Sequence, residues 1–254
     1  MVSVDINCDM GESYGNWEMG NDEGVMPYIT SANIAADYHA GDPHVMRETV
    51  ALAAEHDVGI GVHPGLPDRM GFGRRTMDAS PEELRDFVIH QLGGIRVFAD
   101  YYDLSMQHVK PHGAMYTMLS QSADHTRAVI EGLLKVDPSL VFVATDMNIY
   151  NVAQEYDELR SVFEGFIDID YRPDGSLIVE RKVGPRDTDL MVERFVSMAL
   201  EDEIETPSGE VIEMPADTIC IHGDGANAVE ILEAIHAEKD EYGIELANLD
   251  EIVP

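Results

Sequence analysis

The chain has 254 residues, 44% of them hydrophobic, which suits one large α/β barrel or two ordinary domains. Its formal net charge is −33, from 49 acidic and 16 basic residues, so nucleic acids and anionic membranes would repel it. No apolar run approaches the length of a membrane span, and the first residues do not resemble a signal peptide. We therefore expect a cytoplasmic protein.

Seven apolar runs of strand type alternate with helical periods along the chain. We expect strands at residues 4–9, 31–36, 58–63, 106–110, 140–144, 161–167 and 218–222. Asp42 and Pro43 should begin one helix as N-cap and first-turn proline, and Ser80 should begin another with a capping box. Further helices are expected near 122–135, 147–156, 187–201 and 226–240.

The alternation of strands and helices predicts a parallel sheet. Seven such units without a linker favour a single domain over residues 1–254: a distorted (β/α) barrel of the TIM type, with seven strands. A doubly wound open sheet is the alternative. Residues 169–186 and 202–217 are longer connections with turn signals, and each is expected to form a hairpin beside the barrel.

Polar residues recur where the predicted strands end. In a parallel barrel the carboxyl ends of the strands carry the chemistry, so these residues should share one site. They are Asn7, Asp9, Glu12, Asn33, His39, His63, Lys110, His112, Asp168, His222 and Asp224. This placement on one side of six strands is the strongest functional signal in the sequence.

Alternation of side chains along a strand supports the same site. Asp5, Asn7 and Asp9 share the face that should point into the barrel, while Cys8 should face the helices. Cys220 should face the barrel interior, because it shares the strand parity of His222. Neither cysteine belongs to a CxxC pair, so we expect both thiols to stay reduced, without a disulfide or a cysteine zinc site.

The stretch HVKPHGAMY, residues 108–116, should direct several side chains toward the carboxyl end of the barrel, which we call the barrel mouth. Lys110 follows the strand parity of His108, and Pro111 lacks the N–H needed to continue the ladder. A lone lysine is usually a solvated charge, but only four lysines occur in this chain, which favours a functional Lys110. His112 and His222 each begin a His-Gly pair at a strand end, whereas His63 could equally be structural.

The loop MGFGRR, residues 70–75, offers glycine N–H groups and the forked donors of Arg74 and Arg75. Together with Arg69, these side chains would suit a carboxylate or phosphate. The alternative is a structural loop held by salt bridges. The P-loop, GxSxG and HExxH motifs are absent from the sequence.

Six stretches of the chain carry specific motifs, in this order: DINCDMGES, MPYITSANIAADYHAGDP, GVHPGLPDRMGFGRR, VKPHGAMY, DYRPDGSLIVER and CIHGDGANAV. Together they resemble the LamB/YcsF family over nearly the whole chain. The resemblance implies a seven-stranded (β/α) barrel related to the glycoside hydrolase/deacetylase superfamily. It further implies the A subunit of a 5-oxoprolinase, which works with subunits PxpB and PxpC. That complex opens 5-oxo-L-proline to L-glutamate and consumes ATP, which we expect as its magnesium complex.

The resemblance suggests roles for the residues at the strand ends. Lys110 would offset charge on the lactam oxygen or a phosphate, and Asp9 and Glu12 would orient water or act as bases. His112 and His222 would transfer protons, with Asp224 beside them. The expected substrate-binding residues are Asn7, Asn33, His39, His63, Arg74, Arg75 and Asp168.

Two stretches of the chain depart from the family pattern. Asp37 and Tyr38 stand where the family usually has glycine and phenylalanine, and Ile169 replaces the usual arginine after Asp168. If that arginine contacts the substrate, this chain acts on a different lactam or acid. The departures leave the expected fold unchanged.

Two other functional classes remain open from the sequence. One is a metal-dependent hydrolase of the deacetylase type, with Asp9, His63, His112 and His222 as ligands, although we predict no firmly bound metal. The other is a carbohydrate- or acid-binding protein without catalysis. A bound metal at one equivalent would favour the deacetylase.

The spread of the acidic residues is informative in itself. They occur along the whole chain, and lysine is scarce. Such a surface favours a protein that works in concentrated salt, where the repulsion is screened, over an acidic protein of dilute cytoplasm.

Overall fold

Parallel strands form a closed barrel in the computed structural model, which describes residues 1–179 and 184–253. The barrel strands are β1 (Val2–Met10), β2 (Ser31–Ala35), β3 (Gly59–His63), β4 (Met106–Val109), β5 (Val141–Ala144), β6 (Ser161–Phe166) and β11 (Thr218–Cys220). They pair in this order, and β11 pairs with β1 through Asp5 and Thr218, which closes the ring. All seven predicted strands and the barrel are confirmed, and the open doubly wound sheet is wrong.

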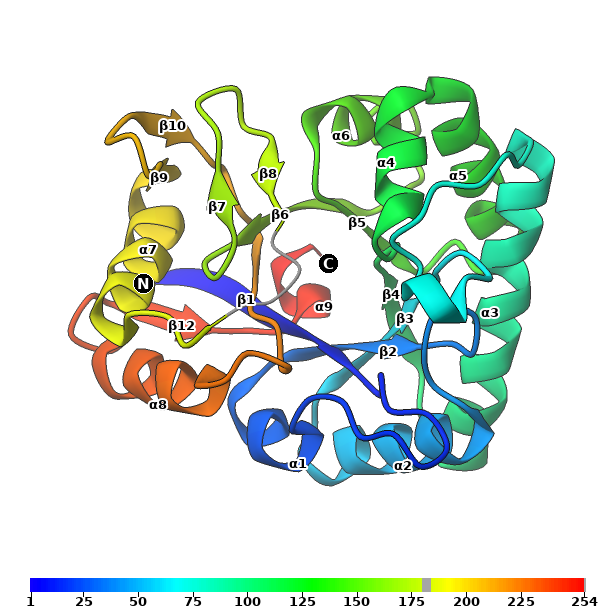
Figure 1. Ribbon diagram of the computed structural model, residues 1–254, viewed down its shortest axis with the longest axis horizontal. Coiled ribbons are helices and arrows are strands. Elements are labelled where there is room, and N and C mark those ends of the chain that lie inside the picture. The colour runs from blue at the N-terminus through cyan, green and yellow to red at the C-terminus, as the bar shows by residue number, and fades with distance from the viewer. Residues whose placement is uncertain (180–183, 254) are drawn as a thin grey trace.

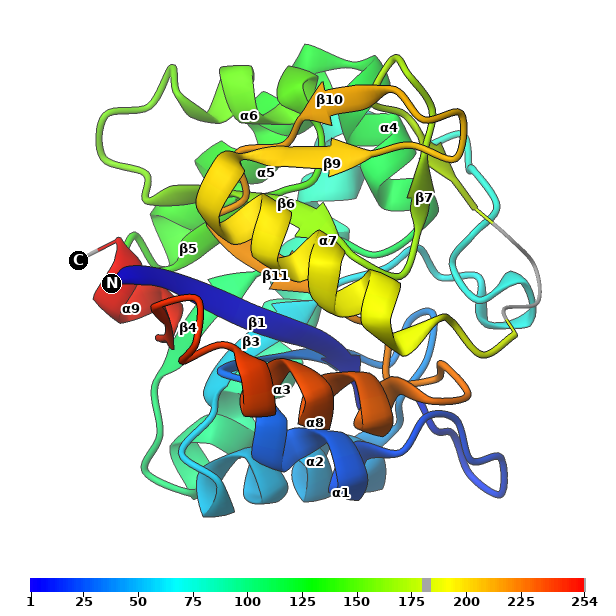
Figure 2. The same cartoon turned by 90° about the vertical axis from the view of Figure 1, so that its left-hand side faces the viewer.

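The two long connections form hairpins, as predicted. Strands β7 (Asp170–Tyr171) and β8 (Leu177–Ile178) pair in the first, although residues 180–183 of that connection lie outside the described residues. Strands β9 (Glu203–Glu205) and β10 (Val211–Glu213) pair in the second, beside helix α7 (Thr188–Glu201) on the outside of the barrel (Figure 2). The sequence did not predict β12 (Ile244–Leu246), which pairs with the first residues of β1.

Helices surround the barrel (Figure 1). They are α1 (Asp22–Val25), α2 (Pro43–Glu55), α3 (Pro81–Tyr101), α4 (Ala114–Gln121), α5 (Ala123–Val136), α6 (Met147–Ala153), α7 (Thr188–Glu201), α8 (Ala228–Glu238) and α9 (Leu249–Ile252), with short 3-10 turns at Met26–Tyr28 and Arg69–Gly71. The two predicted caps are confirmed. Asp42 accepts hydrogen bonds from the first-turn amides of α2, and Ser80 and Glu83 form the capping box of α3.

The two ends of the barrel differ in chemistry. Helix α9 lies beside the amino terminus of β1, where Leu249 packs on Val141, Val143 and Val162 (Figure 2). This apolar contact covers the amino-terminal end. It leaves the carboxyl ends of the strands as the end that is free to form a site.

The barrel interior is polar, and glycines make room for it. Asp5 is fully buried and accepts hydrogen bonds from Thr30, Ser31 and Thr218. A Cβ atom on Gly61 would lie 1.9 Å from Nε2 of His108, so only glycine fits opposite that ring. The predicted inward parity of Asp5 is thereby confirmed, and the interior forms a rigid hydrogen-bonded base for the site.

We expect the melting temperature of the protein to rise strongly with KCl concentration. The net charge of −33 repels itself, and the Debye length falls from about 30 Å at 0.01 M salt to about 3 Å at 1 M. Thermal unfolding followed by circular dichroism checks this, with sucrose as a non-ionic control. A melting temperature that does not change between low and molar KCl would contradict the high-salt interpretation.

No helix within residues 1–179 and 184–253 is both long and apolar enough to cross a membrane.

Candidate active site

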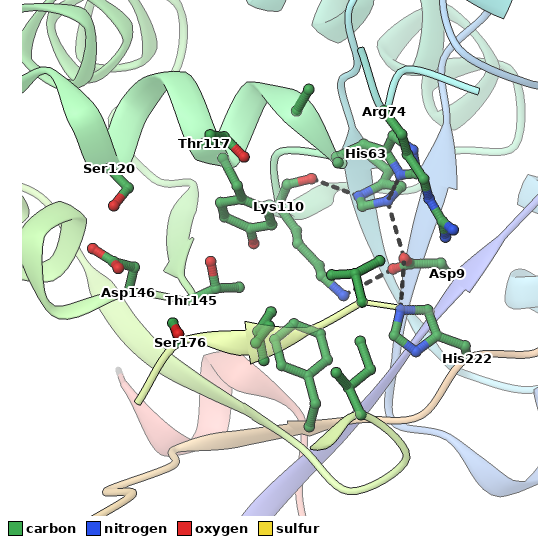
Figure 3. A pocket seen from close by; sticks show the side chains of 18 of the residues that line it. Asp9, His63, Arg74, Lys110, Thr117, Ser120, Thr145, Asp146, Ser176 and His222 are labelled. Atoms are coloured by element: carbon green, nitrogen blue, oxygen red, sulfur yellow. Dashed lines mark hydrogen bonds and ion pairs between the residues drawn. The ribbon is translucent and has the colours of Figure 1, made fainter. Parts of the chain in front are cut away.

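A cavity of about 450 Å³ opens at the carboxyl ends of the strands. Six predicted site residues line it: Asp9, His63, Lys110, His112 and His222, and with them Arg74. Figure 3 shows Lys110 directed at Asp9, with His63 and His222 on either side of that carboxylate. The prediction that one site gathers these side chains at the barrel mouth is confirmed.

The stretch after β4 is built to present its side chains. The Lys110 amide still donates to the carbonyl of Val62 on β3, which continues the ladder by one residue. Pro111 then ends it, and the His112 amide donates to the carbonyl of Pro64. Gly113, with φ of 52°, turns the chain into α4. Lys110 and His112 are thus fixed by backbone contacts on both sides.

Lys110 is the central cation of the site and is only 1% exposed. Its Nζ lies 2.8 Å from Oδ1 of Asp9 and 2.8 Å from Oε1 of Glu164, and it also contacts Asn7 and Cys220. Burial opposes the charged form, yet the Asp9 and Glu164 carboxylates hold the pKa of Lys110 well above its usual range. The side chain is therefore a fixed ammonium at the floor of the cavity.

Asp9 is its carboxylate partner. Burial would raise the pKa of Asp9, but His63 and Lys110 hold it well below its usual range. Oδ1 of Asp9 also accepts a hydrogen bond of 3.0 Å from Asn33, while Oδ2 lies 3.1 Å from Nε2 of His63. Asp9 thus keeps one oxygen bound by Lys110 and turns the other toward the histidines.

His222 forms a second charged pair with Asp168. Both carboxylate oxygens of Asp168 lie 3.1 Å from Nδ1 of His222, and one of them also accepts a hydrogen bond from the backbone N–H of His222. Burial alone would lower the pKa of His222, but the Asp168 carboxylate raises it to about 9. Because Nε2 lies 3.9 Å from Asp9, a protonated imidazole borders the cavity at neutral pH.

A group of aromatic and acidic side chains packs beside Asp9, and two of its members, His63 and His112, line the cavity. His39 is stacked on His112 with ring centroids 3.8 Å apart, and His63 meets His112 edge-on. Glu12 approaches Nε2 of His39 at 3.5 Å and Nδ1 of His112 at 3.8 Å. Burial lowers the pKa of His39 and of His112 well below the usual range, and raises that of Glu12 well above it.

Four more predicted site residues lie around the cavity lining without belonging to it. Asn7 and Asn33 are buried beneath it, where the amide of Asn33 donates to Oδ1 of Asn7. Asp168 stands behind His222, and the side chain of Asp224 is exposed. None of these four residues is therefore placed to contact a ligand directly: three support the residues of the site, and Asp224 lies at the surface.

The predicted arginine cluster is dispersed. Arg75 is bound by Asp68 in a two-point ion pair, and Arg69 is bound by Asp37 and lies over the ring of Tyr14. Arg74 lines the cavity. The predicted anion site shared by the three arginines is therefore wrong. Two of them form structural salt bridges, as the alternative interpretation of this loop proposed.

The two departures from the family pattern have different consequences. Asp37 has φ of 71°, a left-handed conformation that suits glycine and that aspartate tolerates. Its carboxylate holds Arg69, and it does not line the cavity. Ile169, in contrast, lies on the cavity lining, where it replaces a charged donor with an apolar surface.

Sequence reasoning missed Glu164 and the wall opposite the histidines. Glu164 is the lone acid of an apolar strand and shares its parity with Phe166, a signal that could have placed it inside the barrel. The missed wall comes from α4, the loop after β5 and the β7–β8 hairpin (Figure 3). Its members are Tyr116, Thr117, Ser120, Gln121, Thr145, Asp146, Gly175, Ser176 and Leu177.

Comparison with known proteins agrees with this architecture. The LamB/YcsF family profile matches residues 4–253. A Pyrococcus horikoshii protein, named as the A subunit of 5-oxoprolinase, is 44% identical, covering 99% of this chain and all of its own. A protein of the same name from Staphylococcus saprophyticus is 40% identical, covering 98% of this chain and 99% of its own.

Solved structures support the same assignment. The lactam utilization protein from Thermus thermophilus is 35% identical with a TM-score of 0.89, covering 97% of this chain and 100% of that one. A structure from Enterococcus faecalis, 13% identical with a TM-score of 0.62 over 100% of this chain and 99% of its own, shares the fold alone. The chain belongs to the LamB/YcsF family.

Proposed function

We propose that this chain is the A subunit of a 5-oxoprolinase and hydrolyses the lactam of 5-oxo-L-proline to L-glutamate. Relatives named as the A subunit of that enzyme are 40–44% identical over nearly the whole chain. The observation that carries the proposal is the charged floor of the cavity. There a buried ammonium, a carboxylate and a protonated imidazole, from Lys110, Asp9 and His222, converge at one small site.

The relatives' name also implies further subunits. We propose PxpB and PxpC as the partners, and ATP, as its magnesium complex, as the co-substrate of the complex. A lactam is a stable amide, and transfer of a phosphoryl group to its oxygen makes the ring carbon a better electrophile. Because ATP is abundant in the cytoplasm, we place the reaction there.

The residues of the site suit the steps that follow. The ammonium of Lys110 offsets the negative charge that gathers on the oxygen as water attacks the ring carbon. Asp9 accepts a hydrogen bond from that water through Oδ2, the oxygen that Lys110 leaves free. His222 donates its Nε2 proton to the lactam nitrogen as the C–N bond breaks, and Asp168 stabilises the imidazolium before transfer. Ring opening leaves an acyl phosphate, and a second water molecule hydrolyses it to L-glutamate and inorganic phosphate.

Release of glutamate from 5-oxoproline tests the proposal. The purified chain is combined with the B and C subunits, and glutamate is measured with ATP, without ATP, and with a non-hydrolysable ATP analogue. We expect glutamate only with hydrolysable ATP. In a parallel assay, release of acetate from N-acetylated sugars by the chain alone would instead support the deacetylase alternative.

Replacing Arg74 with lysine should raise the apparent KM for 5-oxoproline by about tenfold or more, with a smaller change in kcat. Lysine keeps the charge but loses the planar fork that grips a carboxylate at two points. Arg75→Lys is the matched control, because Asp68 binds Arg75 away from the cavity. Equal KM values for the two variants would remove Arg74 from substrate binding.

A further inference from the structure

Four side chains from neighbouring strands converge beside the cavity. Glu12 follows β1, His39 follows β2, His63 ends β3 and His112 follows β4. One oxygen or nitrogen atom from each lies within 4.8 Å of the others. We call these four residues the histidine–glutamate cluster.

Hydrogen bonds fix the state of two of these rings. Nδ1 of His63 lies 2.6 Å from the carbonyl oxygen of Lys110, and Nε2 of His112 lies 2.8 Å from that of Phe72. A carbonyl only accepts hydrogen bonds, so each of these two nitrogens carries a proton. In the neutral rings, the remaining nitrogens, Nε2 of His63 and Nδ1 of His112, then present lone pairs.

Those two nitrogens face each other at 2.9 Å. Two lone pairs at this distance repel, so the contact requires a positive species that both can bind. A proton on one ring is the first possibility, and a metal cation is the second. Metal-bound histidines commonly donate their outer N–H to a backbone carbonyl, which is the arrangement of both His63 and His112.

Unsatisfied polar atoms in the same place favour the cation. Among the described residues, Oε1 of Glu12 and both ring nitrogens of His39 have no hydrogen-bond partner. The His39 side chain is 0% exposed and that of Glu12 is 10% exposed. Leaving such groups buried and unpaired destabilises the folded chain. A proton shared between His63 and His112 would leave these atoms unsatisfied, whereas a cation in the cluster would give a partner to Oε1 of Glu12 and to one nitrogen of His39.

We propose that Glu12, His63 and His112 bind one divalent transition-metal cation of the zinc type, with His39 as the fourth ligand. Imidazole nitrogens with one carboxylate suit zinc, cobalt and nickel better than magnesium or calcium, which prefer oxygen. His39 now lies flat on His112, so its ring must tilt before its lone pair reaches the shared centre. The other three ligands form the core.

This ligand set differs from the one that the sequence suggested. His222 directs Nδ1 at Asp168, and its Nε2 approaches Asp9 only at 3.9 Å. Oδ1 of Asp9 is bound by Lys110 and Asn33, and Oδ2 contacts Nε2 of His63 at 3.1 Å, but Asp9 lies outside the group of four mutually close ligand atoms. Glu12 and His39 therefore replace Asp9 and His222 as expected ligands. His63 and His112 line the cavity, so a cation here would border the lactam and could polarise its oxygen or a water molecule.

Metal binding is measured on the full chain alone, without lactam, ATP or partner subunits, so the metal site and the 5-oxoprolinase activity can fail separately. With zinc bound, the glutamate and acetate assays, and not the metal content, decide between the oxoprolinase and the deacetylase. The protein is stripped with a chelator, dialysed, and titrated with zinc chloride in a calorimeter, with magnesium chloride in a parallel run. We expect one zinc ion per chain, no comparable magnesium binding, and a higher melting temperature with zinc. Cobalt should give the visible absorption bands of a four-coordinate site.

Variants locate the ion. His112→Ala and Glu12→Gln should each weaken zinc binding by about 10- to 100-fold or more, since loss of outer-shell partners alone costs that much. His44→Ala is the control, because His44 is exposed and pairs with Glu48 on α2, and its zinc affinity should equal that of the original chain. Circular dichroism confirms that each variant is folded.

Two results would overturn the metal site. One is the absence of stoichiometric zinc binding by the unmodified chain. The other is equal zinc affinity in the unmodified chain and in folded Glu12→Gln. Either would assign the 2.9 Å contact to a proton shared between His63 and His112.

Discussion

Replacing His222 with glutamine should lower the turnover of the reconstituted complex by about 10²- to 10⁴-fold, the range of a lost general acid. Glutamine retains a polar side chain but cannot deliver a proton to the lactam nitrogen. Steady-state release of glutamate gives the measurement. His56→Gln is the matched control, because His56 is exposed at the end of α2. Near-native turnover of His222→Gln would remove the proposed acid.

The pH dependence separates this role from a structural one. His222 is active while protonated, so activity should persist below its pKa of about 9 and fall as pH rises through that value. Asp168→Asn removes the charge that raises the pKa, so the fall should move toward pH 6.5, the ordinary value for histidine. An alkaline limb that stays near pH 9 in Asp168→Asn would contradict the pairing.

Replacing Lys110 with methionine should lower kcat by about two to three decades, which corresponds to the roughly 2.7–4 kcal/mol that one charge-stabilising donor contributes. The loss should fall on kcat more than on KM, because the charge on the oxygen develops during the reaction. Kinetics of the complex at saturating ATP measure both constants. A Lys110→Met enzyme with near-native kcat would contradict the role of the ammonium.

The same substitution should also destabilise the fold. It leaves Asp9 and Glu164 buried without their cation, and breaking a buried pair in this way typically costs about 3–5 kcal/mol. Lys110→Met combined with Glu164→Gln should recover part of that stability but none of the turnover. Urea unfolding of the single and double variants, alongside their kinetics, separates the stability effect from the catalytic one.

Strand periodicity was sufficient to predict much of this site. Parallel strands bring their carboxyl ends together, so Asp9, His63 and Lys110 could be assigned to one mouth from parity and position alone. The caps at Asp42 and Ser80 were predictable because their hydrogen bonds are local in the chain.

The remaining features depend on contacts between distant segments. Nothing local distinguishes Arg74, which lines the cavity, from Arg75, which Asp68 captures seven residues away. Strand parity could place Glu164 inside the barrel, but its ion pair with Lys110 becomes evident only when the two strands are arranged in the fold. Strand β12 and helix α9 are too short to give a periodic signal, since they form only against the finished barrel.

The most direct test of the central claim is the formation of glutamate from 5-oxoproline in mixtures that differ only in this chain. The B and C subunits and ATP are held constant, and the chain is omitted, added unmodified, or added as Lys110→Met. We predict glutamate at a steady rate with the unmodified chain and at least about 100-fold less in the other two mixtures. Glutamate formed equally fast without the chain, or none formed with it, would contradict the account.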